Sequence, residues 1–380
     1  MDFNFKEEQQ QFADALKRWV AKDYSFDERK AIIASPEGVS AKAWATLAEL
    51  GMTALPVPEE QGGFSGTAVD MFVVMQELGR GLVVEPYLAT VSAAEFLKLG
   101  GAHAELLEQV ATGELRLACA LAEKQSRHDL TDIATTAVAS GAGFVLNGQK
   151  SVVVHGAQAG SLVVSARSSG PQRGADGISL FVVPADAPGV SITGYRTIDG
   201  QRAAEVVLSG VAVPAGALIG AEGQGFAILD QASDYACALL CAEALGAMEA
   251  IFAATLDYLK TRSQFGAPIG KFQALQHRMA DMYIHLEQAR SMALLAAVKM
   301  SAPDEERRRT VSAAKFRVGH ALKFVGQQAV QLHGGMGVTN ELPAAHHFKR
   351  LTMIELAFGD ADHHLQRFIA QPSFTATETM

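Results

Sequence analysis

The chain of 380 residues is poor in cysteine, and this limits the kinds of site that it can build. Its three cysteines, Cys119, Cys237 and Cys241, include no C-x-x-C pair. Cys237 and Cys241 stand four residues apart in an apolar stretch, a spacing typical of packing on one face of a helix. Neither a disulfide framework nor a metal site is therefore expected, and a reducing compartment is favoured.

Positive charge and long apolar runs are also scarce. Lys and Arg number 32 against 41 Asp and Glu, so the formal net charge of -9 gives no electrostatic reason to expect a nucleic acid partner. No uninterrupted run of about 18 apolar residues occurs, so no membrane span is expected. The acidic start MDFNFKEEQQQF has no apolar signal core, and a cytoplasmic protein is expected. Charged residues make up only 19%, which favours helix faces buried against other subunits.

The first part of the chain has the periodicity of helices. Leu16 and Trp19 recur at helical spacing, and the same period runs from Phe72 to Leu78, where Gly79 and Gly81 are expected to end the helix. From about residue 116 to 226 the texture changes to short β-rich runs, with a hairpin signal at Asn147-Gly148.

After residue 226 long helical periods return, over 228–261, 272–301 and 306–333, with short connections typical of a bundle. The predicted fold is α+β and mostly α. It has an N-terminal helical domain, a middle antiparallel β-barrel or sandwich domain and a C-terminal four-helix bundle. The expected borders are 1–113, 114–226 and 227–372, followed by a disordered tail at 373–380.

Five strings occur in order along the chain: ELGMTALPVPEEQGG, LNGQKSVVV, GAEGQGF, TRSQFGAPIGKFQALQ and QLHGGMGVTNELP. Together they resemble the acyl-CoA dehydrogenase superfamily over nearly the whole chain, and the last two are the most specific. The resemblance implies FAD at a subunit interface and oxidation of an acyl-CoA thioester to the 2-enoyl-CoA. A carboxylate would remove the α-proton while hydride passes to flavin N5, and an electron-transfer flavoprotein is the implied acceptor.

The string TRSQFG places Arg262 where a helix gives way to a glycine-containing turn. A planar guanidinium there can pair with the FAD pyrophosphate, although a plain surface charge at a helix end is the alternative. The resemblance implies that Arg262 reaches the FAD of a neighbouring subunit, and that the adjacent glycines Gly334 and Gly335, otherwise a helix C-cap, let the backbone approach it. The further FAD contacts that it implies are Phe265, Ile269, Phe272, Gln273, Gln331, Leu332, Ala122 and Val154.

The flavin-facing strand departs from the family pattern. After NGxK the family commonly carries Trp-Ile-Thr, with the Trp against the flavin and the Thr hydroxyl at the ring edge. Here Val152 and Val154 take those places, so the ring stack and the hydroxyl are both missing. In the preceding strand the family's glycines are absent, and Lys124 and Arg127 appear instead; only backbone contacts of Ala122 are expected to remain.

The catalytic base is also displaced. Counting back from Arg367 in FGDADHHLQRF puts Asp360 at the family's glutamate, with Asp362 in reserve. Counting forward from HGGMG lands on Phe358, which predicts a local insertion. An aspartate is one methylene shorter than glutamate, and misplacement by about 1 Å costs roughly 100-fold in rate. The alternative is that Asp360 has no catalytic role and is a solvated or helix-capping residue.

Some family members carry the base on the first helix after the β domain. The matching place here is Ala236, which cannot remove a proton. Asp234 and Glu243 lie nearby in the sequence and are weaker candidates.

This mixture resembles the small subunits of heteromeric acyl-CoA dehydrogenases, such as those for pimeloyl-CoA and steroid side chains, especially in FVGQQAVQLHGG, FKRLTMI and FGDADHHL. Three functions stay open: an enzyme with its own FAD, a partner subunit that donates FAD-binding residues to another chain, and a flavin-free scaffold. The expected partners are an acyl-CoA substrate and either a second dehydrogenase-like subunit or a further copy of this chain, as a dimer or tetramer. The acyl group cannot be chosen.

Overall fold

The computed structural model describes residues 5–101 and 103–372. Contacts divide the chain into two compact units. A helical unit contains Met1–Ala31, Ala68–Val83 and Cys237–Met380, and a sheet unit contains Ile32–Thr67 and Val84–Ala236. The tail expected at 373–380 lies outside the described residues.

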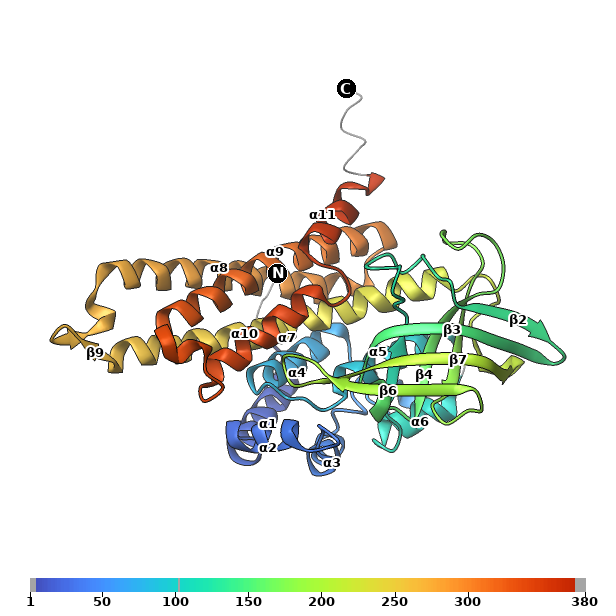
Figure 1. Ribbon diagram of the computed structural model, residues 1–380, viewed down its shortest axis with the longest axis horizontal. Coiled ribbons are helices and arrows are strands. Elements are labelled where there is room, and N and C mark those ends of the chain that lie inside the picture. Colours follow the sequence, from blue (N-terminus) through green and yellow to red (C-terminus); the bar gives the residue numbers. More distant parts are fainter. Residues whose placement is uncertain (1–4, 102, 373–380) are drawn as a thin grey trace, which may run out of the picture. The chain divides into compact units, whose positions relative to one another are not determined.

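The N-terminal part forms the helices that the periodicity predicts (Figure 1). Ser40 begins one of them as an N-cap, because its hydroxyl accepts a hydrogen bond from the backbone N–H of Ala43 at 3.1 Å. The bounds are α1 Glu7–Asp23, α2 Phe26–Ala34, α3 Ala41–Glu49, α4 Ala68–Arg80, α5 Tyr87–Gly100 and α6 Ala104–Ala111.

The C-terminal part is a bundle of long helices, as expected. Helix α9 contacts α8, α10 and α11, and the helices lie alongside one another in Figure 1. Acidic residues Asp304, Glu305 and Glu306 occupy the first turn of α9, where the helix dipole favours negative charge. The bounds are α7 Phe226–Thr261, α8 Gln273–Val298, α9 Asp304–His333, α10 Pro343–Leu356 and α11 Ala361–Ile369.

Helix α4 ends at Arg80, directly before Gly81 as expected, but Gly79 lies inside its last turn and does not end it. Gly79 faces α7, where an added Cβ would lie 2.0 Å from the carbonyl oxygen of Glu243. On α7, a Cβ at Gly246 would lie 1.7 Å from the carbonyl oxygen of Gln76. The two glycines therefore permit backbone contact between α4 and α7 inside the helical unit.

Helix α7 has the length and hydropathy of a membrane span, although charged residues interrupt its apolar runs. Of its most apolar 18-residue window, 78% is buried inside the protein. This burial is that of a core helix.

The sheet unit holds one sheet of strand order β6-β7-β3-β2-β4-β5-β8, with β1 paired to β4. Most neighbours are antiparallel, but β1 and β2 each pair with β4 in parallel. Within the described residues β6 and β8 do not pair, so the expected barrel is not closed and the sandwich alternative holds. The bounds are β1 Leu117–Ala120, β2 Thr136–Ser140, β3 Gly143–Val154, β4 Ser161–Arg167, β5 Ile178–Pro184, β6 Val190–Arg196, β7 Arg202–Pro214 and β8 Leu218–Ile219.

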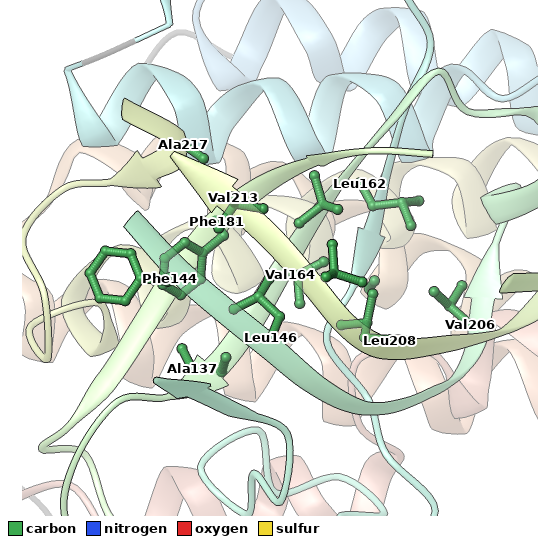
Figure 2. Packing of buried hydrophobic residues seen from close by; sticks show 14 of the residues in the cluster. Ala137, Phe144, Leu146, Leu162, Val164, Phe181, Val206, Leu208, Val213 and Ala217 are labelled. Atoms are coloured by element: carbon green, nitrogen blue, oxygen red, sulfur yellow. The ribbon is translucent and has the colours of Figure 1, made fainter. Parts of the chain in front are cut away.

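The sandwich interior is apolar. Figure 2 shows side chains of β3, β4, β5 and β7 pointing toward one another. Phe144 and Phe181 meet edge to face with ring centroids 5.1 Å apart, and Leu146 and Val164 are fully buried beside them. This core fixes the strand positions that carry the sheet unit's candidate site residues.

Candidate functional site

A short hairpin follows α7 and carries the first predicted cofactor residues. Strand β9, Ser263–Gln264, pairs with β10, Ala267–Pro268, around a turn in which Phe265 and Gly266 both have positive φ, 56° and 78°. The backbone of Arg262 is held on both sides: its N–H donates to Tyr258 O and its carbonyl accepts from the Ile269 N–H, each at 2.8 Å. The hairpin thus has a fixed base, while the Arg262 side chain is exposed.

The hairpin also presents aromatic surface. The Phe265 side chain is 91% exposed, and its ring meets that of Phe272 edge to face at 6.1 Å. Phe272 is the N-cap residue of α8, and the exposed Gln273 begins that helix. An aromatic ring this exposed is typical of a surface that binds a ligand or another chain.

The second predicted cofactor element is the end of α9. Leu332 and His333 are buried there, and the His333 ring stacks on Tyr258 at 4.6 Å, so His333 packs as a structural residue. Gly334 has φ 60°, and an added Cβ at Gly334 or Gly335 would meet no atom within 4 Å. Both glycines therefore border open space that a ligand can approach closely.

The chemistry of these helical-unit residues fits the pyrophosphate and adenosine half of FAD. The Arg262 guanidinium supplies charge-assisted donors for phosphate oxygens. Exposed aromatic rings supply stacking surface, and the two glycines leave room for backbone contact. The other predicted contacts in this unit are the half-buried Ile269 and the exposed Gln331.

The residues of the sheet unit do not fit the ring half of FAD. Val152 and Val154 are 52% and 39% exposed on β3, which has a bulge between Lys150 and Val153 where Val152 takes φ 54°. Neither valine offers a hydroxyl or an aromatic face. The carbonyl of Ala122 accepts a hydrogen bond from the Ser151 N–H at 2.9 Å, so part of its capacity for backbone contacts is used inside the sheet unit.

Asp360 is the N-cap of α11. Its carboxylate accepts from the His363 N–H at 2.8 Å, while Asp362 is exposed in the first turn. The preceding residues Phe358 and Gly359 have φ of 53° and 102°, which puts a left-handed turn where the two counts from the flanking strings disagree.

A buried lysine fixes this segment. The Lys315 ammonium, 1% exposed, donates to the carbonyl oxygens of Glu355, Ala357 and Gly359 at 3.0, 2.8 and 2.6 Å. All three ammonium protons are used. No local pattern signals this role, because Lys315 lies 42 residues before Ala357 and only the fold brings them together.

The weaker base candidates on α7 are not free to act. Glu243 forms a buried ion pair with Arg350, in which Nε and Nη2 donate to its two carboxylate oxygens at 2.6 and 2.8 Å. Asp234 is 2% exposed, and Ala236 is fully buried. A paired carboxylate of this kind stabilises helix packing and is a poor base.

Comparison with known proteins agrees with this architecture. Three family models match in order: the acyl-CoA dehydrogenase N-terminal domain at residues 6–114, the middle domain at 118–211 and the C-terminal domain at 223–371. The probable acyl-CoA dehydrogenase YngJ of Bacillus subtilis (strain 168) is 30% identical over 97% of this chain and 98% of that protein. The chain belongs to the acyl-CoA dehydrogenase family. Membership confirms the resemblance and an oxidoreductase class with FAD as its cofactor.

Solved structures of the family are also similar over their full length. The ChsE4-ChsE5 complex from Mycobacterium tuberculosis has a TM-score of 0.88 at 26% identity and covers 100% of this chain and 100% of that chain. The FAD complex of PigA has a TM-score of 0.90 at 25% identity and covers 99% of this chain and 100% of that chain. The first is a complex of two differently named chains, and the second holds the cofactor.

Proposed function

We propose that this acyl-CoA dehydrogenase is a subunit of an FAD-dependent assembly that oxidises an acyl-CoA thioester to the 2-enoyl-CoA. Its own contribution is to hold the pyrophosphate and adenosine half of a flavin whose ring lies against another chain. The observation that carries the proposal is the outward presentation of Arg262 and Phe265 by the hairpin after α7. When bound, FAD accepts the hydride that leaves the acyl chain.

Each residue has a defined task in this proposal. Arg262 pairs with the pyrophosphate through two parallel N–H donors. Phe265 and Phe272 cover the cofactor and exclude water, and Gly334 and Gly335 let the end of α9 approach the adenosine. The partner is a second acyl-CoA dehydrogenase-like chain, an electron-transfer flavoprotein takes up the electrons, and the cytoplasm is the site of action. The ChsE4-ChsE5 complex among the similar structures supports such an assembly.

A second candidate is that the chain binds its own FAD and uses Asp360, or Asp362 in reserve, to remove the α-proton. The favouring observation is the segment that Lys315 holds through three carbonyl oxygens, directly before Asp360. A base must be placed firmly against the Cα–H, and a fixed segment meets that need.

The substitution Asp360→Asn separates the two candidates. Asparagine caps a helix about as well as aspartate, so the variant removes the carboxylate and keeps the start of α11. In an assembly isolated through a tag on this chain, we expect flavin reduction by acyl-CoA to change by less than about 3-fold, because the base lies on the partner. The rate of flavin reduction is measured by stopped-flow absorbance with straight-chain, dicarboxylic and steroid-derived acyl-CoA thioesters.

Asp362→Asn tests the reserve base in the same way, because Asp362 is exposed in the first turn of α11. A loss of roughly 100-fold or more in either variant would contradict the half-site proposal. The second candidate would then stand, with the base at the residue whose substitution causes the loss.

A further inference from the structure

The loop that joins α9 to α10, residues 334–342 (the glycine loop), begins with the two glycines that border open space. Its other end is tied to α10 through Asn340. The carbonyl oxygen of Asn340 lies 3.1 Å from Nε2 of His346, and its side-chain oxygen accepts a hydrogen bond from the Lys349 ammonium at 2.6 Å. These contacts limit where the glycine end of the loop can lie.

His346 also contacts a buried arginine of α2. Nη1 of Arg29 lies 2.9 Å from Nδ1 of His346, and Nε of Arg29 donates to the carbonyl oxygen of Leu82 at 2.7 Å. Arg29 and His346 are only 1% and 7% exposed. The ring of Phe26 meets the imidazole edge to face, with 4.9 Å between centroids. Contacts therefore run without a break from the chain after α4, through α2 and α10, to the glycine loop.

The two neighbours of the His346 imidazole fix its protonation state. A guanidinium can only donate, so Nδ1 must offer a lone pair to Arg29. A carbonyl oxygen can only accept, so Nε2 must carry the proton that bonds to Asn340. The ring therefore holds both partners only in its neutral form. Protonation of Nδ1 would remove the acceptor and place a second positive charge beside Arg29.

The surroundings of His346 favour that neutral form. Burial lowers its pKa from the ordinary value of 6.5, although the hydrogen bond to the loop carbonyl opposes this effect. The cations Arg29 and Lys30 of α2 and Lys349 of α10 lower the pKa further. His347, the next residue of α10, stays neutral at mildly acidic pH, because burial lowers its pKa to about 3.

We infer that Arg29 and His346 position the glycine loop for cofactor binding, and that they do so only while the His346 imidazole is neutral. The inference rests on the proposed function, because the loop serves the cofactor through the approach of Gly334 and Gly335 to adenosine. Both are positioning residues, since they act on the cofactor only through Asn340.

FAD binding should therefore weaken on acidification. A histidine whose pKa is lowered in the held state contributes fully above its ordinary pKa of 6.5, and this contribution is lost as the pH falls below that value. At about pH 5.5, one unit below, the affinity of the assembly for FAD should be up to about 10-fold lower than at about pH 7.5.

The substitution His346→Gln separates this role from plain packing. A glutamine amide offers one acceptor and one donor but does not titrate, so FAD affinity at about pH 7.5 should stay within about 3-fold and its fall at about pH 5.5 should disappear. His346→Leu removes both hydrogen bonds and should weaken FAD binding about 10-fold at both pH values. His320→Gln is the control, since His320 is exposed on α9, and it should keep the pH-dependent fall. Equilibrium dialysis of the assembly against FAD measures the affinities.

Amide hydrogen exchange in residues 334–342 of the chain expressed alone adds a readout that does not involve flavin. We expect exchange there to be at least about 5-fold faster in His346→Leu than in the unsubstituted chain, because the loop loses its hold on α2. His320→Gln should exchange as the unsubstituted chain does.

Unchanged exchange in His346→Leu would overturn the inference, and so would faster exchange with unchanged FAD affinity. If His346→Leu fails to fold, a fall in affinity at about pH 5.5 that persists in His346→Gln would overturn it equally. Full flavin content in Arg262→Ala would contradict the proposed function and leave the exchange result unaffected, so the two failures can be distinguished.

Discussion

Arg262→Ala should weaken FAD binding by the assembly about 10- to 100-fold, because charge-assisted hydrogen bonds contribute roughly 1.5–3 kcal/mol. The backbone bonds of residue 262 to Tyr258 and Ile269 do not involve the side chain, so the hairpin should persist. The FAD affinity of Arg262→Lys should lie between those of the unsubstituted assembly and Arg262→Ala, since an ammonium keeps the charge but cannot donate two parallel hydrogen bonds. The ratio of flavin to protein after gel filtration measures how much FAD each variant retains.

Arg18→Ala is the matched control for this experiment. Arg18 is exposed on α1, away from the hairpin and the end of α9 in sequence. It should retain flavin as the unsubstituted assembly does, with the same melting temperature. Full flavin content in Arg262→Ala would show that this guanidinium does not hold the cofactor.

Lys150→Met should destabilise the protein by about 3–5 kcal/mol, because it leaves a buried carboxylate without its cation. The fully buried Lys150 ammonium donates to Glu123 at 2.7 Å, Ser165 at 3.1 Å and the carbonyl of Leu121 at 3.2 Å. Burial raises the pKa of Glu123, but the Lys150 ammonium, together with hydrogen bonds from Thr135 and Gln125, outweighs burial and lowers that pKa to about 2. The pair therefore stabilises the fold above the ordinary pKa of 4.5, and this stabilisation is lost as the pH falls toward 2.

The pH dependence of the variant should differ. Lys150 is the charge that most opposes burial at Glu123, so we expect its removal to raise the pKa of Glu123 and to make ionisation of that carboxyl less favourable in the folded protein. The deficit should therefore shrink between pH 7 and pH 4.5 in chemical denaturation. Lys30→Met, which removes an exposed pair with Asp27, should cost less than about 1 kcal/mol. A deficit below about 1 kcal/mol in Lys150→Met would refute the role given to this pair.

Local patterns were enough to predict the element types. Period-3.6 runs predicted the long helices and short apolar runs predicted the strands, because burial of one face imposes those periods. The role of Gly79 was predicted wrongly, since a glycine that ends a helix and a glycine that lets a neighbouring helix pack closely look alike in sequence. Closure of the sheet could not be predicted either, because it depends on whether β6 and β8 pair.

The candidate site divides in the same way. The hairpin at Arg262 and the glycines after α9 lie within short strings, so their surroundings could be read locally. Two contacts could not be predicted from the sequence, because their partners lie far apart along the chain. The Glu205 carboxylate accepts a hydrogen bond from Ser151, 54 residues earlier, and the Lys315 ammonium donates one to Ala357, 42 residues later. A single acidic residue in the strand string AEVVL gives no sign of its contact with β3.

If the proposed function holds, this chain serves another chain's flavin better than its own. Native mass spectrometry with flavin titration tests this most directly, on the chain expressed alone and on the assembly isolated through its tag. We predict little FAD on the chain alone and, in the assembly, two copies of each of two chains with fewer than one FAD per polypeptide. A stable homo-oligomer with one tightly held FAD per chain would contradict the half-site role, and absence of flavin from both samples would leave only a scaffold.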